Sequence, residues 1–233
     1  SNPLKYPGSQ YAKRDVIGDT AVINNFKYDA LRDYYTKWYG PDNQAIIVVG
    51  DINVDEVENA IKKLWADVPA RSNRGERPLY SVDDNVEPIV AIVQDKEAQQ
   101  TRVQVDYKKP KLPKQMRTTN EAYLISILQR LICDMLDYRF QDLALEPEAS
   151  LVVGGAFYSE LVKEKDAFSA VYLAKAGKET QALNDLLIQL EKMRRYGFNA
   201  SELERVKTEM LTQYEKLYNE RNTVRNIAYA QEY

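Results

Sequence analysis

Residues 28–51, YDALRDYYTKWYGPDNQAIIVVGD, hold the clearest sequence signal for the fold. From Tyr28 to Tyr39, apolar and aromatic side chains recur at three- and four-residue steps, which predicts an amphipathic helix. Gly40-Pro41 predicts its end. The β-branched run Ala45–Val49 predicts a strand that is buried on both faces of a sheet.

The stretch that follows predicts a second helix, which runs to about residue 66. Asn53 with Glu56 three residues later resembles a capping box. Only one strong strand lies near these two helices, so we expect residues 1–80 to be the C-terminal part of an α/β domain whose other strands lie outside this chain. Residues 69–88 are polar and rich in helix and strand breakers, which predicts a linker.

Residues 81–233 show strands in pairs, followed by helices. The expected strands are Ile89–Val93, Val103–Tyr107, Leu151–Tyr158 and Ala167–Ala174. The expected helices begin near Thr118, which has Glu121 three residues later, near Leu183, and after Asn199, which has Glu202 three residues later. The order β-β-α-β-β-α-α favours an α+β fold in which an antiparallel sheet packs against helices in two layers.

Two details of this second part concern possible ligand contacts. Lys108–Lys114 holds four lysines and two prolines and is interpreted as a solvated loop. Gly154-Gly155 lies inside a strand pattern, where glycine often marks a bulge or a close backbone approach. An edge at these glycines that binds an extended peptide by strand addition is the alternative interpretation.

Composition excludes several kinds of catalytic site. The 233 residues include no histidine and one cysteine, Cys133. A Ser-His or Cys-His pair, an imidazole metal ligand, a disulfide and a four-cysteine zinc site are therefore absent. The net charge of -3 argues against nonspecific nucleic-acid binding, and no apolar run predicts a membrane span. We expect either a non-catalytic module or a piece of a longer protein.

Two stretches resemble a known family. One is residues 31–43, LRDYYTKWYGPDN, which runs on into Ile46–Asp51. The other is Gly197–Leu203, GFNASEL, with Lys207 in the helix that follows. Both are similar to the insulinase/pitrilysin group of zinc metallopeptidases, the inverted zincins, and to the related processing peptidases. The resemblance extends from about Tyr11 to about Tyr218.

The resemblance implies a zinc metalloendopeptidase as the longer protein, with this chain as an inactive part of it. In that family, H-x-x-E-H and a later Glu hold zinc and activate water, upstream of the aromatic helix. This chain has no histidine, so we assign no catalytic, cofactor-binding or metal-ligating residue to it. The family encloses peptides in a chamber between two halves. Residues 1–80 and 81–233, the latter truncated at its C-terminus, would form wall and scaffold of one half.

Other candidate side chains favour structural roles. The acidic residues Asp142, Glu146 and Glu148, and Asp83-Asp84 in the linker, lack the spacing of a calcium loop. Cys133 is expected on the polar side or at the margin of its helix stripe, with no base or cation to activate it. The aromatic face of the first helix is expected to be core; if its cover lies outside this chain, the exposed patch would promote self-association.

Three functional hypotheses remain open on the sequence. The first is the inactive part of a bacterial zinc peptidase, whose partners would be a peptide or protein substrate and the other half of the same protein or a homologous subunit. The second is a structural or assembly subunit of the same fold, and the third is a peptide-binding module. The resemblance favours a periplasmic or cell-envelope location over the cytoplasm, and the sequence itself does not fix the compartment.

Overall fold

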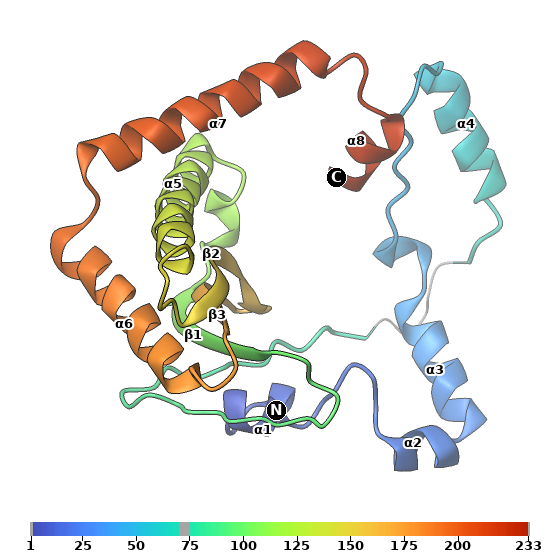
Figure 1. Ribbon diagram of the computed structural model, residues 1–233. Coiled ribbons are helices and arrows are strands. Elements are labelled where there is room, and N and C mark those ends of the chain that lie inside the picture. The colour runs from blue at the N-terminus through green and yellow to red at the C-terminus, as the bar shows by residue number, and fades with distance from the viewer. Residues whose placement is uncertain (1, 70–74, 233) are drawn as a thin grey trace. The chain divides into compact units, whose positions relative to one another are not determined.

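The computed structural model describes residues 2–69 and 75–232 (Figure 1). The chain divides into two compact units. Unit 1 contains residues 1–15 and 79–213, and unit 2 contains residues 16–78 and 214–233. Each unit is described by itself below. The expected domains at 1–80 and 81–233 stay a prediction.

Unit 1 is built on a three-stranded antiparallel sheet. Its strands are β1 (Thr101–Pro110), β2 (Leu151–Val162) and β3 (Lys165–Ala174), in the spatial order β1-β3-β2. The strands β2 and β3 form a hairpin, and β1 pairs with β3 without a register shift from Thr101 to Pro110. Three of the four expected strands are thus confirmed, and the sheet packs against helices as the α+β prediction requires.

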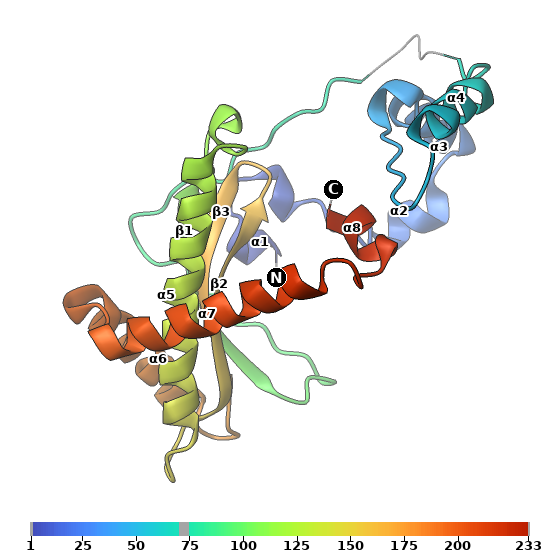
Figure 2. The ribbon, with the colours of Figure 1, turned by 90° about the horizontal axis from the view of Figure 1, so that it is seen from above.

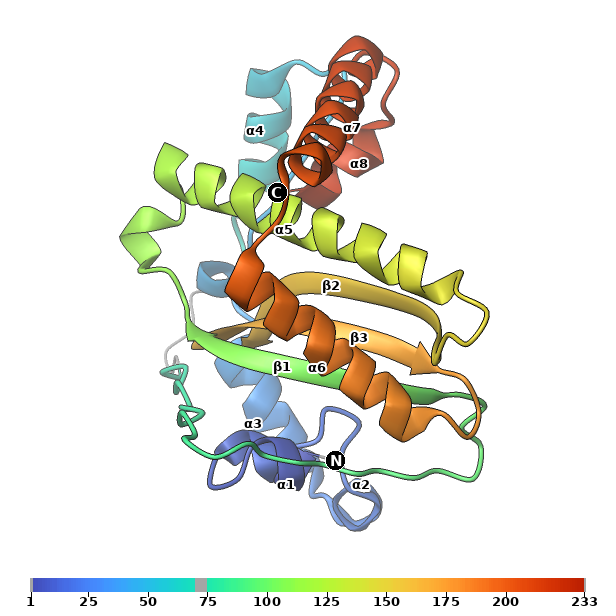
Figure 3. The ribbon, with the colours of Figure 1, turned by 60° about the vertical axis from the view of Figure 1, so that its left-hand side comes forward.

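Two helices, α5 (Asn120–Ala144) and α6 (Glu179–Tyr196), cover one face of the sheet (Figures 2 and 3). Alternate strand residues face them, as the two-residue period of a strand demands. The buried core consists of side chains from both helices and from β2 and β3: Cys133, Leu136, Phe140, Leu151, Ala156, Phe168, Ala170, Tyr172, Ala174, Ala182, Leu186 and Leu190.

Helix ends in unit 1 follow local capping chemistry. Thr119 caps α5 by accepting from the Ala122 N–H, so the expected cap at Thr118 is wrong by one residue. The α6 helix ends at Gly197, whose φ of 66° suits a residue without a Cβ. Helix α7 (Ala200–Glu220) begins with the expected capping box, described below.

Short elements complete unit 1. They are α1 (Asn2–Lys5) and the 3₁₀ turns η1 (Gln10–Ala12) and η3 (Lys114–Met116). The Ser9 hydroxyl donates to the Ser81 carbonyl, and Val82 is buried. The start of residues 79–88 is therefore packed within unit 1, which corrects the prediction of a linker over residues 69–88. Residues 70–74 of the predicted linker lie outside the described residues.

Unit 2 contains helices α2 (Thr20–Asn25), α3 (Tyr28–Trp38), α4 (Val54–Leu64) and α8 (Asn226–Glu232), and the 3₁₀ turn η2 (Pro41–Asn43). The predicted boundaries of α3 hold. The predicted capping box of α4 also holds, because Asn53 accepts from the Glu56 N–H and donates to the Glu56 carboxylate.

Two predicted strands are not formed. Ala45–Val49 and Ile89–Val93 pair with no strand among the described residues, and all their large side chains except that of Val49 are exposed. A strand requires main-chain partners from elsewhere, and β propensity alone does not supply them. Unit 1 therefore reads β-α-β-β-α-α and lacks the first expected strand.

Two smaller expectations about unit 1 are corrected in part. Lys108, Lys109 and Pro110 belong to β1, so only the later part of Lys108–Lys114 lies outside a strand. The register shifts of β2 lie between Leu151 and Val153 and between Glu160 and Val162, so Gly154-Gly155 is not a bulge. Gly154 instead marks a close approach: a Cβ there would lie 2.7 Å from the Tyr172 ring and 3.0 Å from Phe140 Cβ.

Candidate functional site

The polar side chains of α5 that face the sheet are the strongest candidates for chemistry in unit 1. Asp137 Oδ1 accepts the Ala156 N–H of β2 at 2.7 Å. One helical turn earlier, Cys133 is buried in the core; burial raises the pKa of its thiol, and the Tyr158 main chain slightly lowers it. Both strand residues lie on β2, which is an edge strand, and they are two positions apart, so their N–H groups point the same way, away from β3. Helix α5 thus satisfies the outward N–H of Ala156 at that edge.

The electrostatics of these two groups suit a structural role. Burial raises the pKa of the Asp137 carboxyl to about 6; the Asp134 charge adds to this, and the Ala156 N–H opposes it. Burial, followed by the charges of Asp137 and Asp134, raises the pKa of the Cys133 thiol to about 12. A thiol with such a pKa stays protonated near neutral pH and is a poor nucleophile. Cys133 is buried in the core, so its expected place at the stripe margin is wrong, whereas its expected lack of activation agrees with this pKa.

A small polar pocket of about 180 Å³ separates α5 from the first part of α7. Its charged groups pair with one another. Arg130 lies 3.6 Å from Asp134 and donates to the Gln213 amide oxygen at 2.6 Å, and the Tyr138 hydroxyl donates to Glu209. Burial raises the pKa of Asp134, and Arg130 opposes that rise. The pocket contains acids, but each has a partner within the unit.

Arg139 connects α5 to the turn at Gly197–Leu203, the second stretch that resembles the family. Its guanidinium donates to both carboxylate oxygens of Glu202, at 2.5 and 2.9 Å, and to the Gly197 carbonyl at 2.9 Å. The guanidinium carbon also lies 4.5 Å from the centre of the Phe198 ring. The pairing with Arg139 is the largest cause of a lowered Glu202 pKa. A planar, bidentate pair of this kind fixes orientation as well as charge.

The same Glu202 closes the predicted capping box of α7. Its carboxylate accepts the Asn199 N–H at 2.8 Å, and the Asn199 side chain accepts the Glu202 N–H at 2.9 Å. The motif GFNASEL therefore ends α6, starts α7 and attaches both to α5. Lys207, further along α7, pairs with Glu204 on the exposed face.

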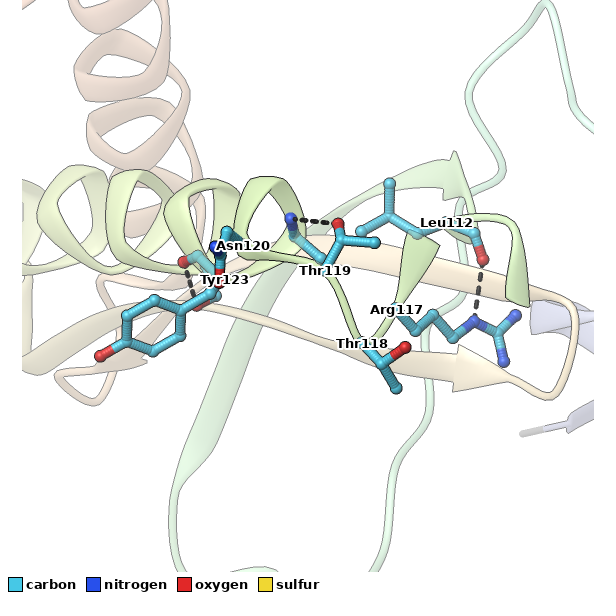
Figure 4. Close-up of a pocket in the computed structure, with 8 residues that line it drawn as sticks. Leu112, Arg117, Thr118, Thr119, Asn120 and Tyr123 are labelled. Atoms are coloured by element: carbon cyan, nitrogen blue, oxygen red, sulfur yellow. Dashed lines mark hydrogen bonds between the residues drawn. The ribbon is translucent and has the colours of Figure 1, made fainter. Parts of the chain in front are cut away.

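A larger, open pocket of about 470 Å³ lies beside the start of α5 (Figure 4). Three of the side chains that line it already have hydrogen-bond partners. The Arg117 Nε donates to the Leu112 carbonyl at 2.8 Å, Thr119 caps the helix, and the Ser126 hydroxyl donates to the Tyr123 carbonyl. These bonds hold the loop against the helix, and none of the described side chains that line this pocket is both buried and unpaired.

The other candidates from the sequence lie apart from these sites. Glu148 pairs with Lys178, and Asp84 with Lys165. Lys108 donates to the Asp83 carbonyl, and Lys111 pairs with Glu160, so part of the basic run holds its own unit together. No group of three or more Cys, Asp or Glu within residues 2–69 and 75–232 could hold a metal ion. The described residues therefore do not provide the zinc ligands of the family that the two motifs resemble.

Tyr172 is unusual, because the hydroxyl of a buried tyrosine commonly has a hydrogen-bond partner. Its side chain is fully buried on β3, with its ring edge-on to Phe140 at 4.9 Å. Its hydroxyl has no hydrogen-bond partner among the described atoms. Burial, with the Asp185 charge as a second cause, raises the pKa of this phenol.

The aromatic face of α3, expected to be core, is largely exposed. Tyr28, Leu31, Tyr34, Tyr35 and Tyr39 are all more than half exposed. Tyr35 and Tyr39 stack on each other at 5.1 Å, so the rings contact one another along the helix. The self-association expected from this face stays a prediction.

Sequence reasoning missed Asp137 and Arg139, which make the decisive contacts of α5. A signal for Asp137 existed: it lies four residues after Cys133, on the side of the helix that carries Leu136 and Phe140. For Arg139 no local signal existed, because its partner Glu202 lies 63 residues away.

Comparison with known proteins agrees with the motifs. Residues 25–210 match the family described as the Peptidase M16 inactive domain. The probable zinc protease PqqL of Haemophilus influenzae is 25% identical over 203 residues, and the Escherichia coli protein of that name is 24% identical over 213. These alignments cover 86% and 90% of this chain but only 21% and 22% of the relatives. The chain thus spans about a fifth of their length.

Solved structures share the fold. The first half of the periplasmic protease PqqL from E. coli matches 99% of this chain with a TM-score of 0.76 and 22% identity, and the match covers 48% of that half. A mutant of the ferredoxin protease FusC, in complex with Arabidopsis ferredoxin, matches 89% of this chain and 23% of its own with a TM-score of 0.69 and 21% identity. None of the described helices could cross a membrane.

Proposed function

Because this chain belongs to the peptidase M16 family, also called insulinase/pitrilysin, and carries its inactive domain, we propose that it forms a non-catalytic wall of the chamber in which a longer zinc peptidase encloses its substrate. In such a protein a zinc ion held elsewhere would activate the water that cleaves the peptide bond. This chain would supply shape and support, and the other half of the protein, or a homologous subunit, would close the chamber.

One observation carries this proposal: the polar side chains of α5 are used to hold the fold. Asp137 accepts a main-chain N–H of β2, Cys133 is buried in the core, and Arg139 binds Glu202 and Gly197. A catalytic acid or nucleophile must be free to reach a substrate. These groups instead form a rigid joint between helix and sheet, which is what a scaffold needs.

The substrate class is proposed from the relatives. PqqL is named a zinc protease and FusC a ferredoxin protease, whose structure contains ferredoxin. We propose that the longer protein likewise acts on a peptide or small protein, and that unit 1 contributes surface to the enclosing wall.

A direct experiment tests the inactive role. The purified chain is dialysed against zinc, its metal content is measured, and it is incubated with a library of unstructured peptides. We expect less than stoichiometric zinc and no cleavage. Turnover that disappears in Cys133→Ala or Asp137→Asn would contradict the proposal, because those side chains are assigned here to structure alone.

The coding sequence upstream separates the remaining hypotheses. An H-x-x-E-H motif with a later Glu would support an active peptidase as the longer protein. A longer gene without that motif would favour the structural or assembly subunit. A short gene that starts near residue 1 would favour an independent peptide-binding module.

A further inference from the structure

We draw no further inference here: the strongest candidate, the β1 edge of the sheet in unit 1 together with the exposed β-branched segment Ala45–Val49 of unit 2, carries nothing, because nothing in the described structure shows what covers either of them.

Discussion

In unit 1, Leu136 and Phe140 of α5 are buried in the core against a sheet, whereas in unit 2 Leu31, Tyr34 and Tyr35 of α3 are more than half exposed. The described residues of unit 2 form no strand on which α3 could pack. Leu136 and Leu31 occupy comparable places on the two helical stripes, yet Leu136 is fully buried and Leu31 is 57% exposed. The difference shows that an apolar stripe specifies which face of a helix needs a packing partner. The surface that covers this face then decides how much the helix contributes to stability.

The largest expected effect tests this difference directly. Leu136→Ala should lower the free energy of unfolding of unit 1 by about 3 kcal/mol, because it removes buried methyl groups and leaves a cavity. Leu31→Ala should change stability by less than about 0.5 kcal/mol. Urea denaturation read through amide exchange of each unit measures both. Equal losses would mean that α3 is buried in solution.

A second prediction concerns how tightly the buried region is packed. Gly154→Ala would place a Cβ 2.7 Å from the Tyr172 ring, so the core must shift, at a cost of about 2 kcal/mol. The neighbouring Gly155 is the control, because its nearest contact would be Asp137 Oδ1 at 3.9 Å. Thermal unfolding should show Gly155→Ala close to wild type; a similar loss in both variants would point to backbone effects instead of packing.

The third prediction compares ion pairs in the two regions. Arg139→Ala should cost unit 1 about 2 kcal/mol, because it leaves Glu202 and the Gly197 carbonyl without their charged donor. Arg32 also pairs with a carboxylate, Asp29 at 3.3 Å, but both side chains are exposed. Arg32→Ala should have no measurable effect on chemical denaturation. Rescue of Arg139→Ala by Lys at that position would argue against the bidentate geometry.

The smallest effect is a pH dependence that only the buried region should show. The folded pKa of Asp137, about 6, lies above its ordinary value of 3.8. The folded state then binds the proton more tightly, so the contribution of Asp137 is most favourable below about pH 4 and is lost as the pH rises toward 6.

Asp137→Asn removes that loss and retains an oxygen to accept the Ala156 N–H. We expect it to exceed wild type in stability by about 1 kcal/mol above pH 6, a value reduced for solvent screening of this half-buried group, and to match it near pH 4. Asp137→Ala should be less stable at both pH values, because no acceptor remains. An Asn variant with no pH-dependent advantage would refute the raised pKa.

An element of this structure is predictable from the sequence when the contacts that form it join residues close together in the chain. The caps at Asn53 and Asn199, and the end of α6 at Gly197, are local and were predictable. The strands β1, β2 and β3 lie where the sequence predicts strands, with longer bounds than predicted. Ala45–Val49 and Ile89–Val93 have equally good strand composition, but their pairing depends on chain segments that no local pattern identifies.

The candidate site was harder to predict for the same reason. The capping role of Glu202 is local and was expected, whereas its pairing with Arg139 joins residues far apart in the sequence. Cys133 is buried because the sheet covers a wider face of α5 than the stripe of apolar residues in the sequence indicates. The lack of histidine, in contrast, is known from composition alone, and for this reason no catalytic residue is assigned to this chain.

The Glu202 carboxylate takes part in two contacts at once, so its loss would weaken both. One carboxylate completes the cap of α7 and also holds the guanidinium of Arg139 on α5. Fraying of the first turn of α7 therefore releases the α5 contact at the same moment, and loosening of α5 frees that turn. The start of α7 and the middle of α5 should open as one cooperative unit, with matching exchange rates, even though sixty-odd residues of chain separate them.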